Sequence, residues 1–140
     1  MARSGRHLAR RCAVQALYQW QMTGQAPSEI EQNFIRNENL TGKHLDYFLS
    51  LINIIPSYIE KIDEVISHHL DRDPERVDLI EQAILRLGAY ELKYDQDIPT
   101  KVVLDEAIDL AKLFCSEHGY KYINGVLDKV ARDVRSEATD

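Results

Sequence analysis

Residues 80–92 read IEQAILRLGAYEL. Within them Ile80, Ile84 and Leu87 recur at steps of four and three, which is the spacing of residues along one face of an α-helix. Leu85 and Leu92 flank this apolar face. The stretch therefore predicts an amphipathic helix, and the same period recurs outward from it in both directions along the chain.

Glycines and prolines divide the sequence into segments of helical length. These segments cover about 6–22, 28–37, 43–70, 75–94, 100–115 and 120–135. Each long segment repeats the helical spacing of apolar residues, and none alternates with period two for long enough to form a convincing strand. The predicted fold class is all-α, with about seven helices.

Helix boundaries are predicted by capping residues and prolines. Ser28 followed by Glu31 fits a capping box at the start of the second segment. Asp73 before Pro74 fits an N-cap with proline in the first helical position. Pro56 lies inside the third segment, where its missing N–H and its ring either kink the helix or split it in two.

Length and composition indicate an ordinary globular protein. The chain has 140 residues, of which 44% are apolar and 29% are charged, so we expect a single domain. No apolar run approaches the roughly 20 residues that span a bilayer, and the N-terminus lacks the apolar core of a secretory signal. Cys12 and Cys115 have no disulfide or zinc-knuckle spacing, and Cys12 is expected to pack in a helix. We therefore expect a cytoplasmic protein without a membrane partner.

Catalytic and metal-binding patterns are poor. The sequence contains no G-x-S-x-G elbow, no H-E-x-x-H pair and no glycine-rich phosphate loop. Asp105, Glu106 and Asp109 have no histidine or lysine spaced to join them, so we interpret them as an exposed face with Glu106 turned inward. We predict no enzyme activity, no metal and no cofactor.

Charge is unevenly distributed along the chain. The net charge is −6, but residues 1–28 contain four arginines and no carboxylate, which leaves −10 for the remainder. Such a distribution favours one surface for polyanions and another for a basic partner. Arg3, Arg6 and Arg10 share one predicted helix face, with Arg11 about 100° away, and arginine is suited to phosphate. The alternative is a solvated helix face without a ligand.

Two further groups have the chemistry of binding sites. In residues 118–125, HGYKYING, Tyr120 and Tyr122 flank Lys121, and aromatic rings beside cations suit the stacking of single-stranded RNA bases. The alternative is that one of these tyrosines is half-buried in the core. The acidic stretch from residue 75 to residue 81 either complements a basic protein or only the helix dipole.

Four blocks of sequence resemble a known family. They are residues 9–18 (ARRCAVQALY), 84–92 (ILRLGAYEL), 98–112 (IPTKVVLDEAIDLAK) and 122–129 (YINGVLDK). In this order and spacing they resemble the NusB family of transcription antitermination factors. The resemblance implies a single domain, 1–140, of two packed helical bundles, at about 1–72 and about 73–136.

The resemblance also implies a function. Members are noncatalytic adaptors that bind the boxA element of ribosomal RNA operons together with NusE, a small-subunit ribosomal protein. The pair joins the RNA polymerase elongation complex with other Nus factors. Some members form homodimers, so a homodimer is a further expectation. The alternative that the residues leave open is a module that binds only proteins. NusB-like domains also occur fused to RNA methyltransferases, but we expect no such activity here, because nothing in this sequence is left over to hold a methyl donor.

Family roles can be assigned to individual residues of this sequence. The expected RNA-binding residues are Arg3, Arg6, His7, Arg10, Arg11, Gln15, His118, Lys121 and Tyr122. The expected NusE-facing residues are Tyr18, Glu75, Asp78 and Glu81. Whether Tyr120 or Tyr122 stacks on a base stays open.

Some residues of the matching blocks are expected to be structural. Glu91 and Asn124 lie among apolar neighbours, which favours buried hydrogen bonds over ligand contacts. We expect Arg86 to pair with a carboxylate. Gly88 and Gly125 are expected to allow close approach of helices.

Overall fold

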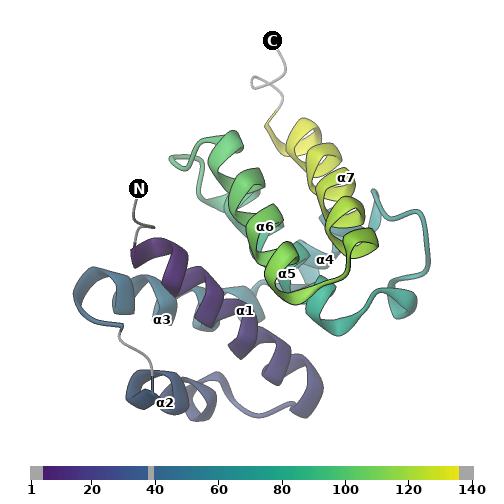
Figure 1. The fold of residues 1–140 in the computed structure, drawn as a ribbon. Helices are drawn as coiled ribbons and strands as arrows, with labels where there is room; N and C mark the ends of the chain where they lie inside the picture. The colour runs from purple at the N-terminus through teal and green to yellow at the C-terminus, as the bar shows by residue number, and fades with distance from the viewer. Residues whose placement is uncertain (1–4, 38–39, 136–140) are drawn as a thin grey trace.

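The computed structural model describes residues 5–37 and 40–135 (Figure 1). These residues form seven α-helices and one short 3-10 helix, and they include no strand, which confirms the predicted all-α class. The elements are α1 (Gly5–Thr23), α2 (Pro27–Asn37), α3 (Gly42–Ser57), α4 (Ile59–Ser67), η1 (Pro74–Arg76), α5 (Leu79–Tyr94), α6 (Thr100–Phe114) and α7 (Glu117–Val134).

Helix α5 is the centre of the fold. It contacts α1, α3, α4, α6 and α7, and half of its residues are buried. On one side α1, α2 and α3 pack together, and on the other α6 and α7 pack together (Figure 1). Helix α4 packs most extensively on α5 and also touches α7. The division into bundles at about residue 72 stays a prediction, but α4 lies with the C-terminal helices.

The predicted apolar faces form the core. On α5 Ile84, Leu87 and Leu92 are buried, and Cys12 is buried on α1 as expected. Phe48 of α3 is fully buried and packs against Phe34 of α2 with the ring centroids 5.6 Å apart. Burying a side chain of this size contributes about 1.5–3 kcal/mol to folding. The residues that helical periodicity placed on apolar faces are thus among those that stabilise the fold.

Two predicted helix starts are wrong by a few residues. Helix α2 begins at Pro27 instead of being capped by Ser28, and the carbonyl of Ala26 accepts from the N–H groups of Glu29 and Ile30. Proline occupies the first helical position because its missing N–H is not needed there. Asp73 precedes only the 3-10 turn. Helix α5 starts at Leu79 and is capped by Asp78, whose carboxylate accepts from the N–H of Ile80.

Pro56 splits the third predicted helix in two. Helix α3 ends at Ser57 and α4 begins at Ile59, with Tyr58 between them. The N–H of Tyr58 is shared between the carbonyls of Ile54 and Ile55, which closes α3 with a tightened last turn.

The C-terminal end of α5 is held by Arg135, which lies just beyond α7. Its guanidinium is buried and donates to the carbonyls of Glu91, Leu92, Asp95 and Ile98. These bonds add to the others at the same carbonyls, such as the one that the N–H of Asp95 donates to the carbonyl of Glu91. Arg135 therefore fixes the α5–α6 connection against the end of α7.

The two glycines that were expected to allow close packing behave differently. A Cβ atom at Gly88 of α5 would lie 2.7 Å from Cδ1 of Leu127 on α7, so the expectation is confirmed there. A Cβ at Gly125 would meet nothing within 4 Å, so that expectation is wrong. Asn124 is exposed rather than buried, because it lies on the solvent side of α7.

This difference between the glycines is measurable. Gly125→Ala should raise the free energy of unfolding by about 0.5–1 kcal/mol, because alanine is the better helix former and the site is open. Gly88→Ala should lower it by about 1 kcal/mol, because the buried side chain of Leu127 must shift and overpacking costs more than the helix gains. Urea unfolding of both variants tests this, and equal stabilisation by the two substitutions would contradict it.

Candidate nucleic-acid interface

The arginine helix α1 is fixed by a buried ion pair. Arg10 is 2% exposed, and its Nε lies 2.9 Å from Oε2 of Glu91 on α5. Its Nη1 lies 3.4 Å from Oε1 of Glu106 on α6, and the hydroxyl of Tyr47 on α3 donates to Glu91. Glu91 was expected to make buried hydrogen bonds, and it does so.

The placement of Arg10 on an exposed phosphate-binding face is therefore wrong. Helix α1 lies between α3 and α5, so its buried surface is wide and includes Arg10 together with Ala9 and Ala13. A signal in the sequence was available, since a glutamate in the apolar stretch 84–92 requires a cationic or hydrogen-bonding partner. The sequence does not say that the partner comes from α1.

Burial sets the protonation states of this cluster. Burial raises the pKa of Glu91, and the charge of Arg10 and the hydrogen bond from Tyr47 oppose that rise. Burial and the neighbouring Glu91 carboxylate raise the pKa of Tyr47, so its phenol stays protonated and available as a donor. The cluster is a charged pair with a neutral donor, which is suited to holding helices together.

Arg6 and His7 lie at the edge of the same cluster. The guanidinium of Arg6 is exposed to solvent and lies 4.3 Å from the centroid of the Tyr47 ring. Nδ1 of His7 lies 2.5 Å from Oε2 of Glu106, and Glu106 is turned inward as expected. Tyr47 thus orients Arg6, and Glu106 orients His7. Neither Tyr47 nor Glu106 was among the predicted site residues.

Two of the other predicted residues of the arginine helix are accessible to solvent. Arg11 and Gln15 are partly exposed and lie one turn apart on α1. Arg3 lies outside the described residues. Of the predicted RNA-binding residues on the described part of α1, Arg6 is therefore exposed, and His7, Arg11 and Gln15 are partly exposed.

The second predicted group lies at the start of α7. His118 and Lys121 are exposed, and Nζ of Lys121 lies 3.0 Å from Oε1 of Glu117 one turn earlier. Tyr122 is half-buried, and the guanidinium of Arg72 lies 3.9 Å from the centroid of its ring. Arg72 was missed because nothing in the sequence links it with a residue fifty positions away.

The two cationic groups lie toward opposite ends of α5. Arg10 reaches Glu91, whereas a Cβ added at Gly119 in α7 would lie 2.6 Å from Oε2 of Glu81. Ten residues of helix separate these two glutamates, or about 15 Å along the axis. The structure therefore does not bring the two predicted RNA-binding groups together at one point.

The predicted partner-facing residues gather near the N-terminal end of α5. The side chain of Gln21 on α1 donates to the carbonyl of Leu79 at 2.6 Å, which brings the end of α1 to the start of α5, and Tyr18 lies one turn before Gln21. A Cβ added at Gly119 would meet both Oε2 of Glu81 and Cβ of Cys115, so Glu81 lies at the α6–α7 connection. Burial and the Glu81 and Asp78 carboxylates raise the pKa of Cys115 to about 11.

Glu75 and Asp78 are exposed, and Tyr18 and Glu81 are half-buried. The described residues contain no group of three or more histidine, cysteine, aspartate or glutamate side chains arranged to hold a metal ion. No helix among the same residues is long and apolar enough to cross a membrane.

A family model described as the NusB family matches residues 7–132. The chain belongs to the NusB family. The NusB transcription antitermination protein of Alcanivorax borkumensis is 46% identical over 138 residues, which cover 98% of this chain and 92% of that protein. The corresponding protein of Pasteurella multocida is 48% identical over 128 residues, which cover 91% of this chain and 89% of that one.

Solved NusB structures share the fold. A crystal structure of the antitermination factors NusB and NusE in complex with double-stranded RNA matches with a TM-score of 0.86 and 29% identity, covering 92% of this chain and 97% of the other. NusB of T. maritima matches with the same TM-score and identity over 99% of both chains. The family predicted from four sequence blocks is thereby confirmed.

The role of Arg10 in this NusB-family chain can be tested through stability. Arg10→Met should lower the free energy of unfolding by roughly 3–5 kcal/mol, because Glu91 is left buried without its cation. Arg11→Met, at the next position, should change it by less than about 0.5 kcal/mol, since Arg11 is partly exposed and pairs with no described carboxylate. Urea denaturation measures both.

A double variant distinguishes the ion pair from loss of packing. Arg10→Met combined with Glu91→Leu removes both charges and should recover most of the lost stability. If the two losses simply add, the pair is not coupled and this account of α1 is wrong.

Proposed function

We propose that this chain is a noncatalytic adaptor that binds boxA-type RNA together with NusE and acts in transcription antitermination within the cytoplasm. The observation that carries the proposal is the match to the NusB family over residues 7–132. The similar solved complex, which contains NusB, NusE and RNA, supports both partners. In this proposal the pair joins the RNA polymerase elongation complex with other Nus factors.

The RNA surface that we propose extends along the molecule. Arg6 and Arg11 supply phosphate contacts on α1, with Arg3 before them in the sequence, and His7 and Gln15 supply hydrogen bonds. His118, Lys121 and Tyr122 supply the contacts on α7. Because the two groups lie on different helices and toward opposite ends of α5, an extended single strand suits them better than a compact element.

Arg10 takes a different role in this proposal. It positions α1 instead of binding phosphate, since its guanidinium is enclosed by Glu91, Glu106 and Tyr47. Arg6 keeps its outer surface free while Tyr47 holds its inner face, so it is already oriented before RNA arrives. A side chain held in this way loses less conformational freedom on binding than a free arginine does.

The proposed NusE surface is acidic. Glu75, Asp78 and Glu81 lie at or before the first turn of α5, and Tyr18 approaches from α1. Ribosomal proteins are commonly basic, so charge complementarity favours this end of the molecule for NusE.

RNA binding can be measured by fluorescence anisotropy with labelled boxA RNA and a scrambled control. We expect a preference for boxA that rises when NusE is present, because the proposed RNA surface of this chain offers few cations for phosphate contacts. Affinity should fall with rising salt, and Arg6→Gln and Arg11→Gln should each reduce the logarithmic salt slope by about 0.7.

The matched control for these arginines is Arg36→Gln, which removes an exposed arginine from the last turn of α2. It should leave both the affinity and the salt slope unchanged. Equal, weak binding to boxA and scrambled RNA, unaffected by NusE, would contradict the adaptor function and favour a module that binds only proteins.

Binding of NusE provides a separate test. Glu75→Lys should weaken NusE binding by about tenfold or more, because it places a cation in the acidic surface that faces a basic partner. Glu60→Lys makes the same change in the first turn of α4 and should have little effect. Isothermal titration calorimetry measures the affinity of both variants for NusE. An equal loss of affinity in the two variants would count against the proposed surface.

A further inference from the structure

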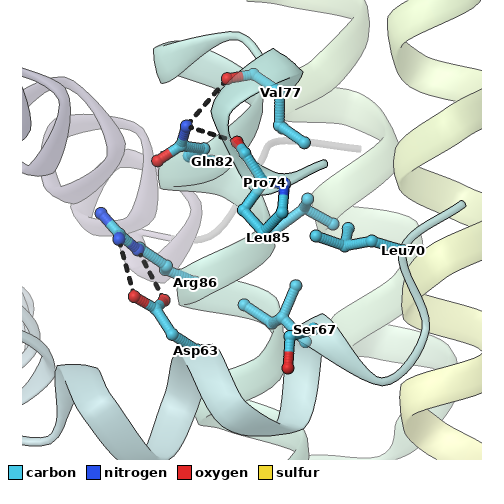
Figure 2. Close-up of a pocket in the computed structure, with 9 residues that line it drawn as sticks. Asp63, Ser67, Leu70, Pro74, Val77, Gln82, Leu85 and Arg86 are labelled. Atoms are coloured by element: carbon cyan, nitrogen blue, oxygen red, sulfur yellow. Dashed lines mark hydrogen bonds and ion pairs between the residues drawn. The ribbon is translucent and has the colours of Figure 1, made fainter. Parts of the chain in front are cut away.

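A pocket of about 290 Å³ lies between α4, the 3-10 turn η1 and the first half of α5 (Figure 2). Its lining is mostly apolar, and it is formed by Ile66, Leu70, Pro74, Val77 and Leu85 together with four polar residues. Small-molecule sites commonly measure about 300–1,000 Å³, so this volume suits one or two side chains better than a cofactor.

The polar groups at the pocket are already bonded to protein. Arg86 donates to both oxygens of Asp63 at 2.9 Å and to Gln21 of α1 at 2.8 Å, which confirms the expected carboxylate partner of Arg86. The amide of Gln82 donates to the carbonyl of Val77 at 2.8 Å (Figure 2).

These bonds have two consequences for a ligand. They hold α1, α4, η1 and α5 in place, so the pocket exists before any ligand binds. They also leave the pocket with little to offer a polar ligand, and an apolar side chain is the group that gains most by entering it.

The segment that contributes Pro74 and Val77 to the pocket is acidic. Residues 71–78 connect two of its walls and carry four exposed carboxylates, Asp71, Asp73, Glu75 and Asp78. Two arginines lie in the same stretch, and one of them, Arg72, is stacked on Tyr122 of α7. The phosphates of an RNA would be repelled here, whereas basic residues would be attracted. The charge therefore favours a basic protein segment over nucleic acid.

We propose that this pocket receives an apolar side chain of NusE that is flanked by basic residues. The inference rests on the proposed function, and it deepens that function by naming the anchor point. The apolar side chain fills the space between Leu70, Val77 and Leu85, while the flanking cations meet the carboxylates of residues 71–78. One anchored side chain in a preformed pocket, beside an acidic segment, is the arrangement of an interface hot spot.

Methyl NMR tests occupancy directly. In the chain labelled at Leu, Val and Ile methyl groups, addition of NusE should shift the resonances of Leu70, Val77 and Leu85. The resonances of Val102 should stay in place, because this exposed residue lies in the first turn of α6, away from the pocket.

A pocket-filling variant tests the energetic role. Ser67 lines the pocket at the end of α4, is exposed, and donates to the carbonyl of Glu64 three residues earlier. Ser67→Trp should weaken NusE binding by at least about 30-fold, the effect of losing one central anchor. Ser67→Ala, which leaves the pocket open, should bind NusE normally.

The matched control is Ser57→Trp. Ser57 ends α3, is exposed, and donates to the carbonyl of Ile54 in the same way, but it lies outside this pocket. It should bind NusE like the unmodified chain. Thermal unfolding and RNA binding of each variant verify folding, and shifts of the Leu70 and Leu85 methyl resonances in free Ser67→Trp verify that the indole enters the pocket.

The outcomes separate the two proposals. If NusE binds the unmodified chain and the three pocket methyl resonances do not move, the pocket is not the anchor point, whereas the partnership stands. If the unmodified chain does not bind NusE at all, the partnership itself is overturned, and the pocket assignment with it.

Discussion

The ion pair between Arg10 and Glu91 lies where α1, α3, α5 and α6 meet, and the placement of the ligand-facing residues follows from it. A charged group without a partner in a protein interior costs several kcal/mol, so neither residue can be buried alone. Rotating α1 by one residue turns its side chains through about 100° and would remove Arg10 from Glu91. The pair therefore fixes both the rotation and the position of α1 along α5, which is a matter of specificity more than of net stability.

That rotation determines what the rest of α1 can do. With Arg10 inward, Arg6 lies over Tyr47 and His7 meets Glu106, while Arg11 and Gln15 remain partly exposed one turn apart. The carboxylates that follow α1 in the sequence fall into a buried group and an exposed group. Glu91 and Glu106 are used inside to hold α1, whereas those of residues 71–78 remain at the surface. An overall charge of −6 thus conceals an internal balance and an exposed acidic region.

Periodicity was sufficient to predict the helices because burial on one face is repeated within each of them. It was also sufficient for Leu87 and Phe48, whose surroundings are apolar whichever helix covers them. Periodicity failed to predict the burial of Arg10, because that burial depends on Glu91, which lies 81 residues further along the chain. The stacking of Arg72 on Tyr122 was inaccessible for the same reason, and so was the pocket, which depends on where the chain runs after α4.

The arrangement at the N-terminal end of α5 offers a physical route for coupling between the two proposed partners. Glu81 lies beside the first turn of α7, and that turn leads to Lys121 and Tyr122. In the chain alone this carboxylate, together with Asp78, opposes the approach of an RNA phosphate to Lys121. A basic partner bound at the acidic surface offsets these charges and removes that opposition. Because coupling between two binding sites is reciprocal, RNA held at Lys121 must then favour the partner by the same factor. Cooperative binding of NusE and RNA therefore requires no change of shape in this chain, since the fixed helices already bring the acidic residues and the cationic group of α7 to the same end of α5.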